Sequence, residues 1–120
     1  MPTGIVVFGH GSSVASANDA VRRVADSAAA AGGWAAWETA FLEVDPLLGA
    51  AVGKLVAQGC DEVLVLPYFL TLGIHLRRDL PAIATELEQQ YGIRIRIAPP
   101  LDGHPGLSGI LVERAREAGQ

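Results

Sequence analysis

Short apolar segments alternate along this chain with longer segments of helical periodicity. The apolar segments are residues 5–8, 34–41, 63–66 and 93–97. Between and after them, apolar side chains recur every three or four residues, which is typical of helices with one buried face. This alternation predicts repeated strand–helix units, which form a parallel sheet with helices on both faces.

The composition of the strands indicates their places in that sheet. "IVVF" and "VLVL" contain no polar residue and are typical of central strands that helices cover on both faces. "IRIRI" alternates, which puts Arg94 and Arg96 on one face and is typical of an edge strand. Right-handed connections then favour the order 2-1-3-4. We therefore expect one α/β domain over residues 1–120, a small doubly wound, mainly parallel four-stranded sheet flanked by helices.

Capping residues predict where the first two helices begin. Ser16 is the expected N-cap of the first helix, and Gly32 and Gly33 end it. Asp45 is the expected N-cap of the second helix, with Pro46 at its first position and Gly59 after its end. The expected buried stripes are Ala17, Val21, Val24 and Ala28 in the first helix and Leu48, Val52, Leu55 and Val56 in the second.

The third and fourth helices follow the same logic. Asp79 is the expected cap of the third helix, which carries Ile83 and Leu87 inward and stops at Gly92. A fourth helix is expected to begin near Pro105. Leu107, Ile110 and Leu111 lie at helical spacing along it.

Composition excludes several classes of partner. A formal net charge of -4 argues against a nucleic-acid surface, which needs clustered Lys and Arg. No apolar stretch approaches the roughly 20 residues that cross a bilayer, and "MPTGIVVFGH" does not resemble a secretory signal. The single cysteine, Cys60, cannot form an internal disulfide. We expect a soluble, cytoplasmic protein with no nucleic-acid or membrane partner.

Three polar side chains follow three different strands. His10 follows the first strand, Glu43 the second, and His75 lies in the long segment after the third. Ligands of open α/β sheets bind at the carboxyl ends of the strands, where the winding reverses. Two imidazoles and a carboxylate suit a divalent first-row metal with positions left open for substrate. Taken singly, each has a plainer interpretation: His10 and His75 as loop histidines, and Glu43 as a solvated residue.

The segment "GHGSS" predicts a turn that a ligand can approach closely. Gly9 and Gly11 allow unusual backbone conformations, and Ser12 and Ser13 with nearby amides can hold a carboxylate or phosphate. The lysine of a P-loop and the third glycine of a dinucleotide fingerprint are missing from this segment. Nucleotide binding is therefore disfavoured.

The segment "YFLTLGIHLRRD" has two open interpretations. Its apolar residues either cover the core or form a wall for a flat, apolar ligand; they are Tyr68, Phe69, Leu70 and Leu72. Arg77 and Arg78 are either surface charges or bidentate ligands for carboxylates. For Cys60 and His104 we favour structural roles, as a small partly buried residue and as the neighbour of a helix cap.

Four segments together resemble a known family. "VVFGHGS", "FLEVDP", "VLVLPYFLTLGIHLRRDLP" and "PPLDGHP" are similar to the short, single-module form of the sirohydrochlorin chelatases, class II chelatases that insert cobalt, iron or nickel into a tetrapyrrole. The resemblance covers almost the whole chain. It departs at Ser13, where many members carry arginine.

The resemblance implies a function and a set of site residues. His10 and His75 would bind the metal, with Glu43 in the same catalytic site. The divalent metal (Co²⁺, Fe²⁺ or Ni²⁺) would be a substrate, with no organic cofactor, in siroheme- or cobalamin-type biosynthesis. Two chains would form a homodimer around the tetrapyrrole. The candidate contacts for the macrocycle are Gly9, Gly11, Ser12, Ser13, Tyr68, Phe69, Leu70, Arg77 and Arg78.

Two other functions compete with this one. A metal or tetrapyrrole carrier would keep the pocket and bind without accelerating insertion. A generic flavodoxin-like binding module would not depend on His10 and His75 at all.

Overall fold

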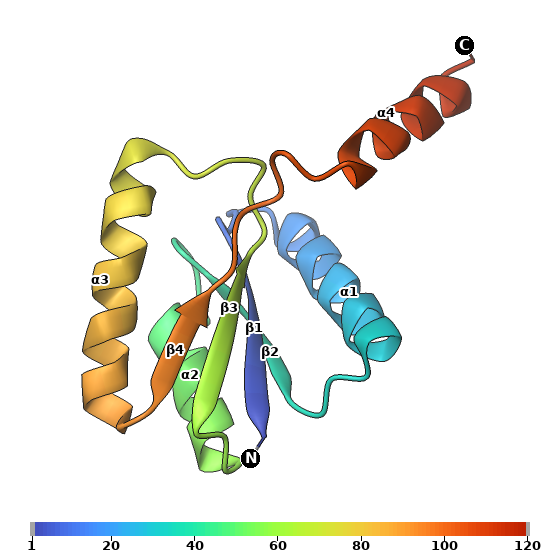
Figure 1. The fold of residues 1–120 in the computed structure, drawn as a ribbon. Coiled ribbons are helices and arrows are strands. Elements are labelled where there is room, and N and C mark those ends of the chain that lie inside the picture. Colours follow the sequence, from blue (N-terminus) through green and yellow to red (C-terminus); the bar gives the residue numbers. More distant parts are fainter. Residues whose placement is uncertain (1, 120) are drawn as a thin grey trace.

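Strands and helices alternate strictly in the computed structural model, which describes residues 2–119 (Figure 1). The elements are β1 (Thr3–Gly9), α1 (Ala15–Gly32), β2 (Trp37–Phe41), α2 (Leu48–Ala57), β3 (Glu62–Pro67), α3 (Ile74–Tyr91), β4 (Arg94–Ile97) and α4 (Gly106–Glu117). All strand pairs are parallel, and the order is β2-β1-β3-β4. The predicted fold class and strand order are confirmed. No helix within residues 2–119 is long and apolar enough to cross a membrane.

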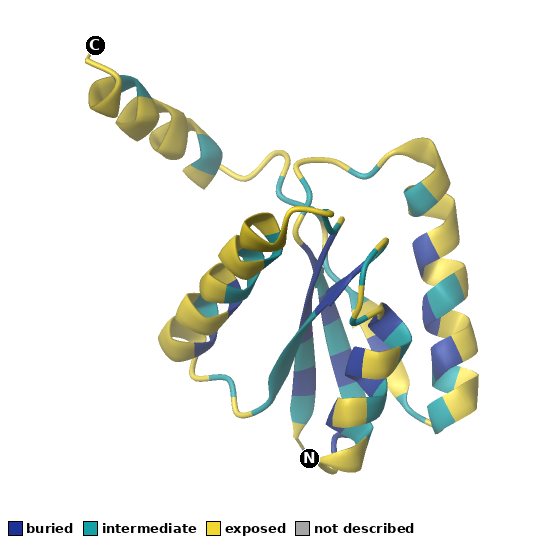
Figure 2. Ribbon diagram, turned by 180° about the vertical axis from the view of Figure 1, so that it is seen from behind, coloured by how far each residue is buried: buried dark blue, intermediate teal, exposed yellow. Residues whose placement is uncertain are grey.

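The core lies between the sheet and the two helices α2 and α3. Val6 and Phe8 of β1 and Val63 and Val65 of β3 point to this side and are fully or almost fully buried. Leu55 of α2 and Leu80 and Leu87 of α3 pack against them. Because side chains alternate along a strand, the intervening residues of β1 and β3 point to the opposite face, where α1 lies (Figures 1 and 2).

The α1 side of the sheet is only partly covered. Helix α1 contacts β1 and β2 and leaves β3 and β4 open. Leu64 and Leu66 of β3 are therefore only half-buried, although the sequence predicted cover on both faces of this strand. That prediction is wrong for this face, because no helix of residues 2–119 lies over it.

Helix α4 begins beside Pro105 as predicted, but it projects away from the body of the molecule (Figure 1). None of its residues is buried, and Ile110, Leu111 and Val112 are exposed (Figure 2). Its apolar side chains have helical spacing, but among them only Leu107 and Ala115 are partly buried within the described chain.

The first helix begins differently from the prediction. Its N-cap is Val14, which makes no side-chain capping bond, and Ser16 lies inside the helix. The residues that α1 buries are Ala25 and Ala29, whereas Ala17 and Val24 are exposed. The predicted stripe is therefore displaced, because the helix turns its alanine row toward β1 and β2.

The second helix starts two residues later than Pro46. The amide of Phe41 donates to the carbonyl of Pro46 at 2.9 Å, and Leu47 forms a parallel bridge with Phe41. These bonds keep residues 46–47 extended beside the end of β2. Neither Asp45 nor Pro46 has its predicted helical role, and α2 begins at Leu48.

The third helix starts earlier than predicted. Gly73 is its N-cap, and the amide of Arg77 closes the first turn on the Gly73 carbonyl at 2.9 Å. Asp79 therefore lies inside the helix and does not cap it. The connection after β3 shortens to residues 68–73, and His75 lies in the first helical turn.

Strand bounds differ from prediction by one to three residues. β2 starts at Trp37 and not at residue 34, because the amide of Trp34 still donates to Ala29 of α1 at 3.0 Å. β4 is an edge strand, as predicted, with Arg94 and Arg96 exposed on one face and Ile95 buried on the other. Arg96 pairs with Glu62 of β3.

Cys60 is a buried core residue, 3% exposed. Burial raises the pKa of its thiol, and the nearby Asp61 carboxylate raises it further. Because the reactive species is the thiolate, we expect native protein to react with a thiol reagent such as Ellman's reagent at least about 100-fold more slowly than protein in urea. Mass spectrometry of the adduct measures this. Equal rates in the two states would contradict the described burial.

Candidate functional site

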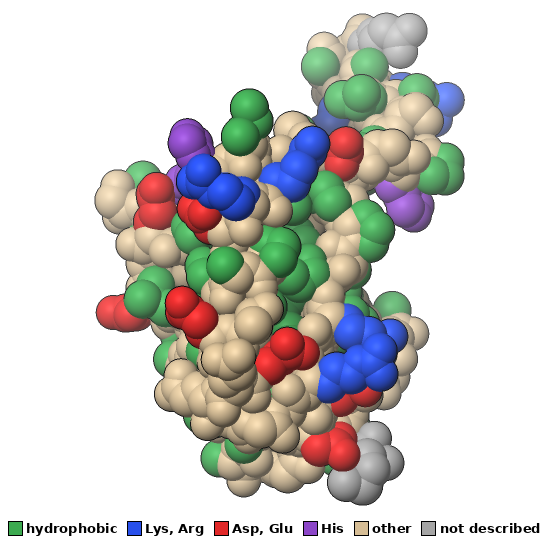
Figure 3. Space-filling view, turned by 60° about the vertical axis from the view of Figure 1, so that its left-hand side comes forward, with side chains coloured by type: hydrophobic (Ala, Val, Ile, Leu, Met, Phe, Trp, Pro, Cys, Tyr) green, Lys and Arg blue, Asp and Glu red, His purple; other side chains and the backbone are tan. Residues whose placement is uncertain are grey.

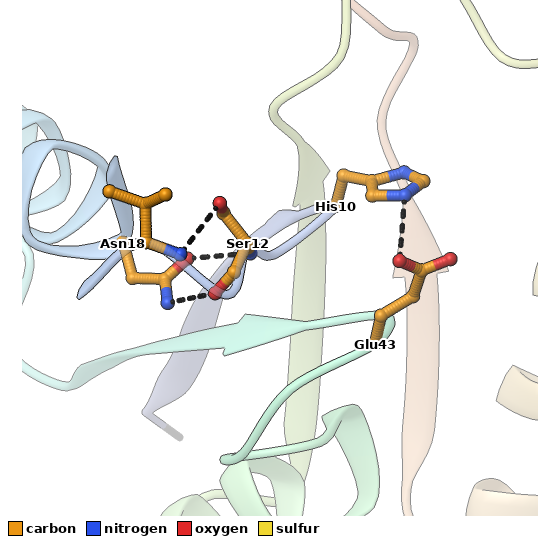
Figure 4. Close-up of polar contacts among 5 residues, drawn as sticks. His10, Ser12, Asn18 and Glu43 are labelled. Carbon is orange, nitrogen blue, oxygen red and sulfur yellow. Dashed lines mark hydrogen bonds and ion pairs between the residues drawn. The ribbon is translucent and has the colours of Figure 1, made fainter. Parts of the chain in front are cut away.

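His10 and Glu43 meet at the carboxyl ends of β1 and β2. The two strands pair up to Gly9 and Phe41, and the pairing continues beyond them. The amides of Leu42 and Glu43 donate to the carbonyls of Gly9 and His10 at 3.0 and 3.1 Å. This backbone alignment brings His10 Nε2 to 3.1 Å from Glu43 Oε2 (Figure 4). The side chains are 58% and 62% exposed, so a ligand can reach both.

This contact gives the pair a defined chemistry. An ionised carboxylate only accepts hydrogen bonds, so His10 Nε2 carries the proton of the bond, as inferred from the hydrogen-bond geometry. In the neutral ring Nδ1 then offers a lone pair, which suits a divalent metal ion. A carboxylate that orients a metal-binding imidazole in this way is a common arrangement in metalloproteins. The pair thus combines a nitrogen ligand with a nearby proton acceptor.

The turn after His10 depends on one glycine. Gly11 has a φ of 88°, a conformation that L side chains rarely adopt. A Cβ at Gly11 would lie 2.8 Å from Val44 Cγ2 and 3.0 Å from Phe41 Cβ. At Gly9 an added Cβ would meet its neighbours at 3.7 Å, an ordinary contact, in the strand itself. Gly11, and not Gly9, therefore shapes the turn.

Ser12 is held by Asn18 of α1. The Ser12 amide donates to Asn18 Oδ1 at 2.9 Å, and Asn18 Nδ2 donates to the Ser12 carbonyl at 2.8 Å (Figure 4). Ser12 Oγ accepts from the Val14 amide at 3.0 Å. These bonds connect the turn to the first helix. They also occupy the amide and the hydroxyl of Ser12, which the sequence suggested as anion-binding groups. The sequence analysis did not identify Asn18. The available signal is an asparagine in the first turn of a helix, where such side chains often accept hydrogen bonds from free amides.

The apolar segment after β3 divides between the two faces of the sheet. Phe69 packs beside Phe8 and His10, with ring centroids 5.9 and 6.2 Å away. Tyr68 and Leu70 are exposed and line a hollow on the α1 side instead. The sequence left open whether these residues cover the core or form a wall for a flat ligand, and the extended backbone sends alternate residues to opposite sides. Phe69 is the member of this set that contacts the histidine.

His75 lies apart from the His10–Glu43 pair in its contacts. It is exposed, and its Nδ1 lies 3.4 Å from an Arg78 guanidinium nitrogen. Arg78 also pairs with Asp79 at 3.0 Å, while Arg77 is exposed. Across residues 2–119, no three His, Cys, Asp or Glu side chains are grouped closely enough to hold a metal ion. The structure therefore brings together two of the three predicted ligands.

An apolar hollow of about 220 Å³ lies between the ends of β1 and β2 and the helices α2 and α3. Its lining includes Phe8 and Leu42, which lie close to His10 and Glu43 in the chain, together with Phe41, Leu48 and Ile83. Basic side chains and a histidine, with acidic side chains among them, lie at the upper edge of the face in Figure 3, above a patch of hydrophobic side chains. His104, away from the pair, accepts a hydrogen bond from the Gly106 amide at 2.9 Å and lies next to Pro105, the N-cap of α4, as expected for the neighbour of a helix cap.

The order β2-β1-β3-β4 places the chain in the class of doubly wound α/β proteins, whose ligands bind outside the carboxyl ends of the strands, the edge at which His10 and Glu43 lie. Within that class the family is shown directly: residues 4–118 match the family model CbiX, and the chain belongs to the CbiX family.

Named relatives agree with that assignment. A sirohydrochlorin cobaltochelatase from Methanopyrus kandleri is 27% identical over 95% of both chains. The structure of the CbiX protein from Marinobacter aquaeolei VT8 superposes with a TM-score of 0.85 at 30% identity, covering 98% of this chain and 97% of that one. The sirohydrochlorin chelatase SirB from Bacillus subtilis, solved with cobalt, gives 0.76 at 27% identity and covers 83% of this chain. This match spans only 44% of SirB, so the chain is similar to one module of a longer protein.

Proposed function

We propose that this protein inserts a divalent metal ion, with Co²⁺ as the first candidate, into sirohydrochlorin or a related tetrapyrrole. The observation that carries the proposal is the exposed His10–Glu43 pair, with Phe69 packed beside the imidazole. A flat macrocycle with carboxylates on its rim needs an apolar surface for its rings and a metal-binding group facing its centre. The names of the CbiX relatives support the same substrate.

In the proposed reaction the metal ion is a substrate that passes through the site. His10 holds it through the free ring nitrogen, because a neutral imidazole is a good ligand for first-row metals. Insertion displaces two pyrrole protons: Glu43, within hydrogen-bond distance of the His10 imidazole, accepts one, and the ring nitrogen of His10 that the metal has left accepts the other. A nitrogen and oxygen ligand set holds the metal loosely enough to release it. Such a set accepts Co²⁺, Fe²⁺ and Ni²⁺, so either siroheme or cobalamin synthesis is a fitting context.

We assign His75, Arg77 and Arg78 to the substrate side of the same site. His75 is the second metal ligand of the proposal, reached when the contact with Arg78 opens. The two arginines are suited to rim carboxylates because a guanidinium binds a carboxylate through two parallel hydrogen bonds. Two chains acting together as a homodimer would enclose the macrocycle, since each chain by itself leaves His10 and Glu43 exposed.

The test is an anaerobic insertion assay. Sirohydrochlorin is mixed with Co²⁺, Fe²⁺ or Ni²⁺, with and without protein, and the change in the tetrapyrrole absorbance is followed. Acceleration over the protein-free rate supports the proposal and ranks the metals. Tight binding without acceleration would instead indicate a carrier, and neither binding nor acceleration would point to an unrelated binding module.

His75→Ala should slow insertion by about 10-fold to 100-fold while leaving the fold intact. His75 is exposed and makes one weak contact, so its removal changes a ligand without disturbing packing. Gln89→Ala, at an exposed position on the same helix, is the control and should keep the full rate. Equal rates for His75→Ala and the unaltered protein would remove His75 from the site.

A further inference from the structure

The turn that carries His10 is attached to the rest of the molecule on both sides. On one side, the His10 carbonyl accepts a hydrogen bond from the Glu43 amide at 3.1 Å, which continues the pairing of β1 with β2. On the other side, two bonds to Asn18 hold the amide and the carbonyl of Ser12 at 2.9 and 2.8 Å. In the view of Figure 4, Asn18 and the His10–Glu43 pair lie on opposite sides of Ser12. The position of the imidazole therefore depends on both attachments.

Gly11, between these two attachments, permits the turn but does not enforce it. Glycine moves among backbone conformations more freely than any other residue, including the φ of 88° found here. The turn is closely packed on its inner side, where a Cβ at Gly11 would lie 2.8 Å from Val44 Cγ2 and 3.0 Å from Phe41 Cβ. These side chains limit movement of the turn in one direction only. In the other directions the bonds to Ser12 limit it.

Asn18 uses its side-chain amide on this turn and not on its own helix. Its Oδ1 accepts from the Ser12 amide and its Nδ2 donates to the Ser12 carbonyl, a pairing that also defines the orientation of the Asn18 amide group. Within residues 2–119 these two groups of Ser12 have no main-chain partner, so Asn18 alone satisfies them. Asparagine is also a weaker helix former than leucine. Stability of α1 therefore does not account for this side chain.

The groups that receive the His10 ring are fixed independently of the turn. Glu43 Oε2 lies 3.1 Å from the ring, and the Phe69 ring meets it edge-on, with centroids 6.2 Å apart. The Phe69 carbonyl accepts from the Leu101 amide at 2.9 Å, and the Phe69 ring packs beside Phe8 with centroids 5.9 Å apart. The imidazole makes both of its contacts only when the turn presents it to these groups.

We infer that Asn18 is a positioning residue of the candidate site, which holds the His10 ring in place through Ser12. With both of its bonds made, the ring stays between Glu43 and Phe69. The inference rests on the proposed function for the task of the imidazole, but the position of the ring is measured without metal or tetrapyrrole. Residues that orient a metal-binding imidazole typically change metal affinity or activity by about 10-fold to 100-fold when they are replaced.

Two substitutions separate the bonds of Asn18 from the stability of its helix. Asn18→Leu has a similar shape and removes both bonds to Ser12, while leucine favours the helix. Asn18→Asp keeps an acceptor for the Ser12 amide, but its second oxygen cannot donate to the Ser12 carbonyl. Ser16→Ala, at an exposed position in the first turn of the same helix, is the control. Circular dichroism should show that all three variants are folded, because Asn18 lies outside the buried core.

Proton NMR of the metal-free protein reports the position of the His10 ring. Nuclear Overhauser contacts between the His10 and Phe69 rings should be present in the unaltered protein and in Ser16→Ala. They should be lost in Asn18→Leu and weakened in Asn18→Asp. The ring signals of His75 and His104, which lie in other segments, should be the same in all of these proteins.

The insertion assay measures what this position contributes to the reaction. At saturating tetrapyrrole, Asn18→Leu should insert Co²⁺ about 10-fold more slowly than the unaltered protein. Its KM for the tetrapyrrole should stay within about twofold, because Asn18 holds a metal-binding ring and not the macrocycle.

The two measurements separate failure of this inference from failure of the proposed function. An unchanged ring contact in Asn18→Leu, a full insertion rate after the contact is lost, or the same losses in Ser16→Ala would each overturn the inference. If the unaltered protein does not accelerate insertion, the proposed function fails. The ring contact alone then decides whether Asn18 positions His10.

Discussion

His10→Ala should reduce the rate of metal insertion to near the spontaneous rate, a loss of roughly 100-fold or more. The ring is more than half exposed and its polar contact is to Glu43, so the substitution removes the proposed ligand without opening a cavity. Its edge contact with Phe69 is a minor loss for the fold. The absorbance assay gives the rate, and thermal unfolding should stay within a few degrees of the unaltered protein.

Glu43→Gln separates the two proposed roles of the pair. Glutamine still accepts the hydrogen bond from His10 Nε2, but it cannot take up a proton. We therefore expect metal binding to survive while insertion slows by about 10-fold or more. Glu86→Gln, an exposed carboxylate on α3, is the matched control and should be without effect. If His10→Ala or Glu43→Gln kept the full rate with the fold intact, the strand-end pair would not be the site.

Gly11→Ala should be the most destabilising single substitution in the candidate site. The φ of 88° costs an L residue about 1–2 kcal/mol, and the added Cβ would lie 3.0 Å from Phe41 Cβ, which belongs to a fully buried side chain. Together these effects lower the free energy of unfolding by about 3 kcal/mol, or roughly 10 °C in Tm.

Gly9→Ala is the control for this experiment. Gly9 has an ordinary strand conformation, and its added Cβ would contact Phe41 and Val21 at 3.7 Å. Its effect on the free energy of unfolding should stay within about 1 kcal/mol. Urea unfolding followed by circular dichroism measures both variants. Equal stability of the two would show that the turn adapts to a side chain at Gly11.

The sequence predicted the sheet well because its signals are local and repeated. Four apolar runs and the helical periodicity between them led to the observed strand order, and glycines at 59 and 92 marked where α2 and α3 end. Helix starts were predicted poorly. Ser16, Asp45 and Asp79 are all good capping residues, but backbone bonds from neighbouring segments decided where the helices begin, as when Pro46 pairs with Phe41.

The position of the candidate site could be predicted from the sequence, but the side chains that contact one another in it could be predicted only in part. Strand order alone places His10 and Glu43 at adjacent strand ends, and the structure brings them into contact. The contact of Phe69 with His10 and the bonds of Asn18 to Ser12 depend on side-chain directions, which sequence spacing does not reveal.

The sequence by itself determined the alternation of strands and helices, the winding of the sheet and the edge at which the polar groups gather, because periodicity and connection handedness govern these features. Only the tertiary structure decided which apolar faces are covered. β3 and α4 both have the composition of buried elements, but burial requires a surface to pack against. The linker before α4 is bonded to Phe69 and Leu70, and α4 projects from the body of the molecule with only Leu107 and Ala115 partly buried.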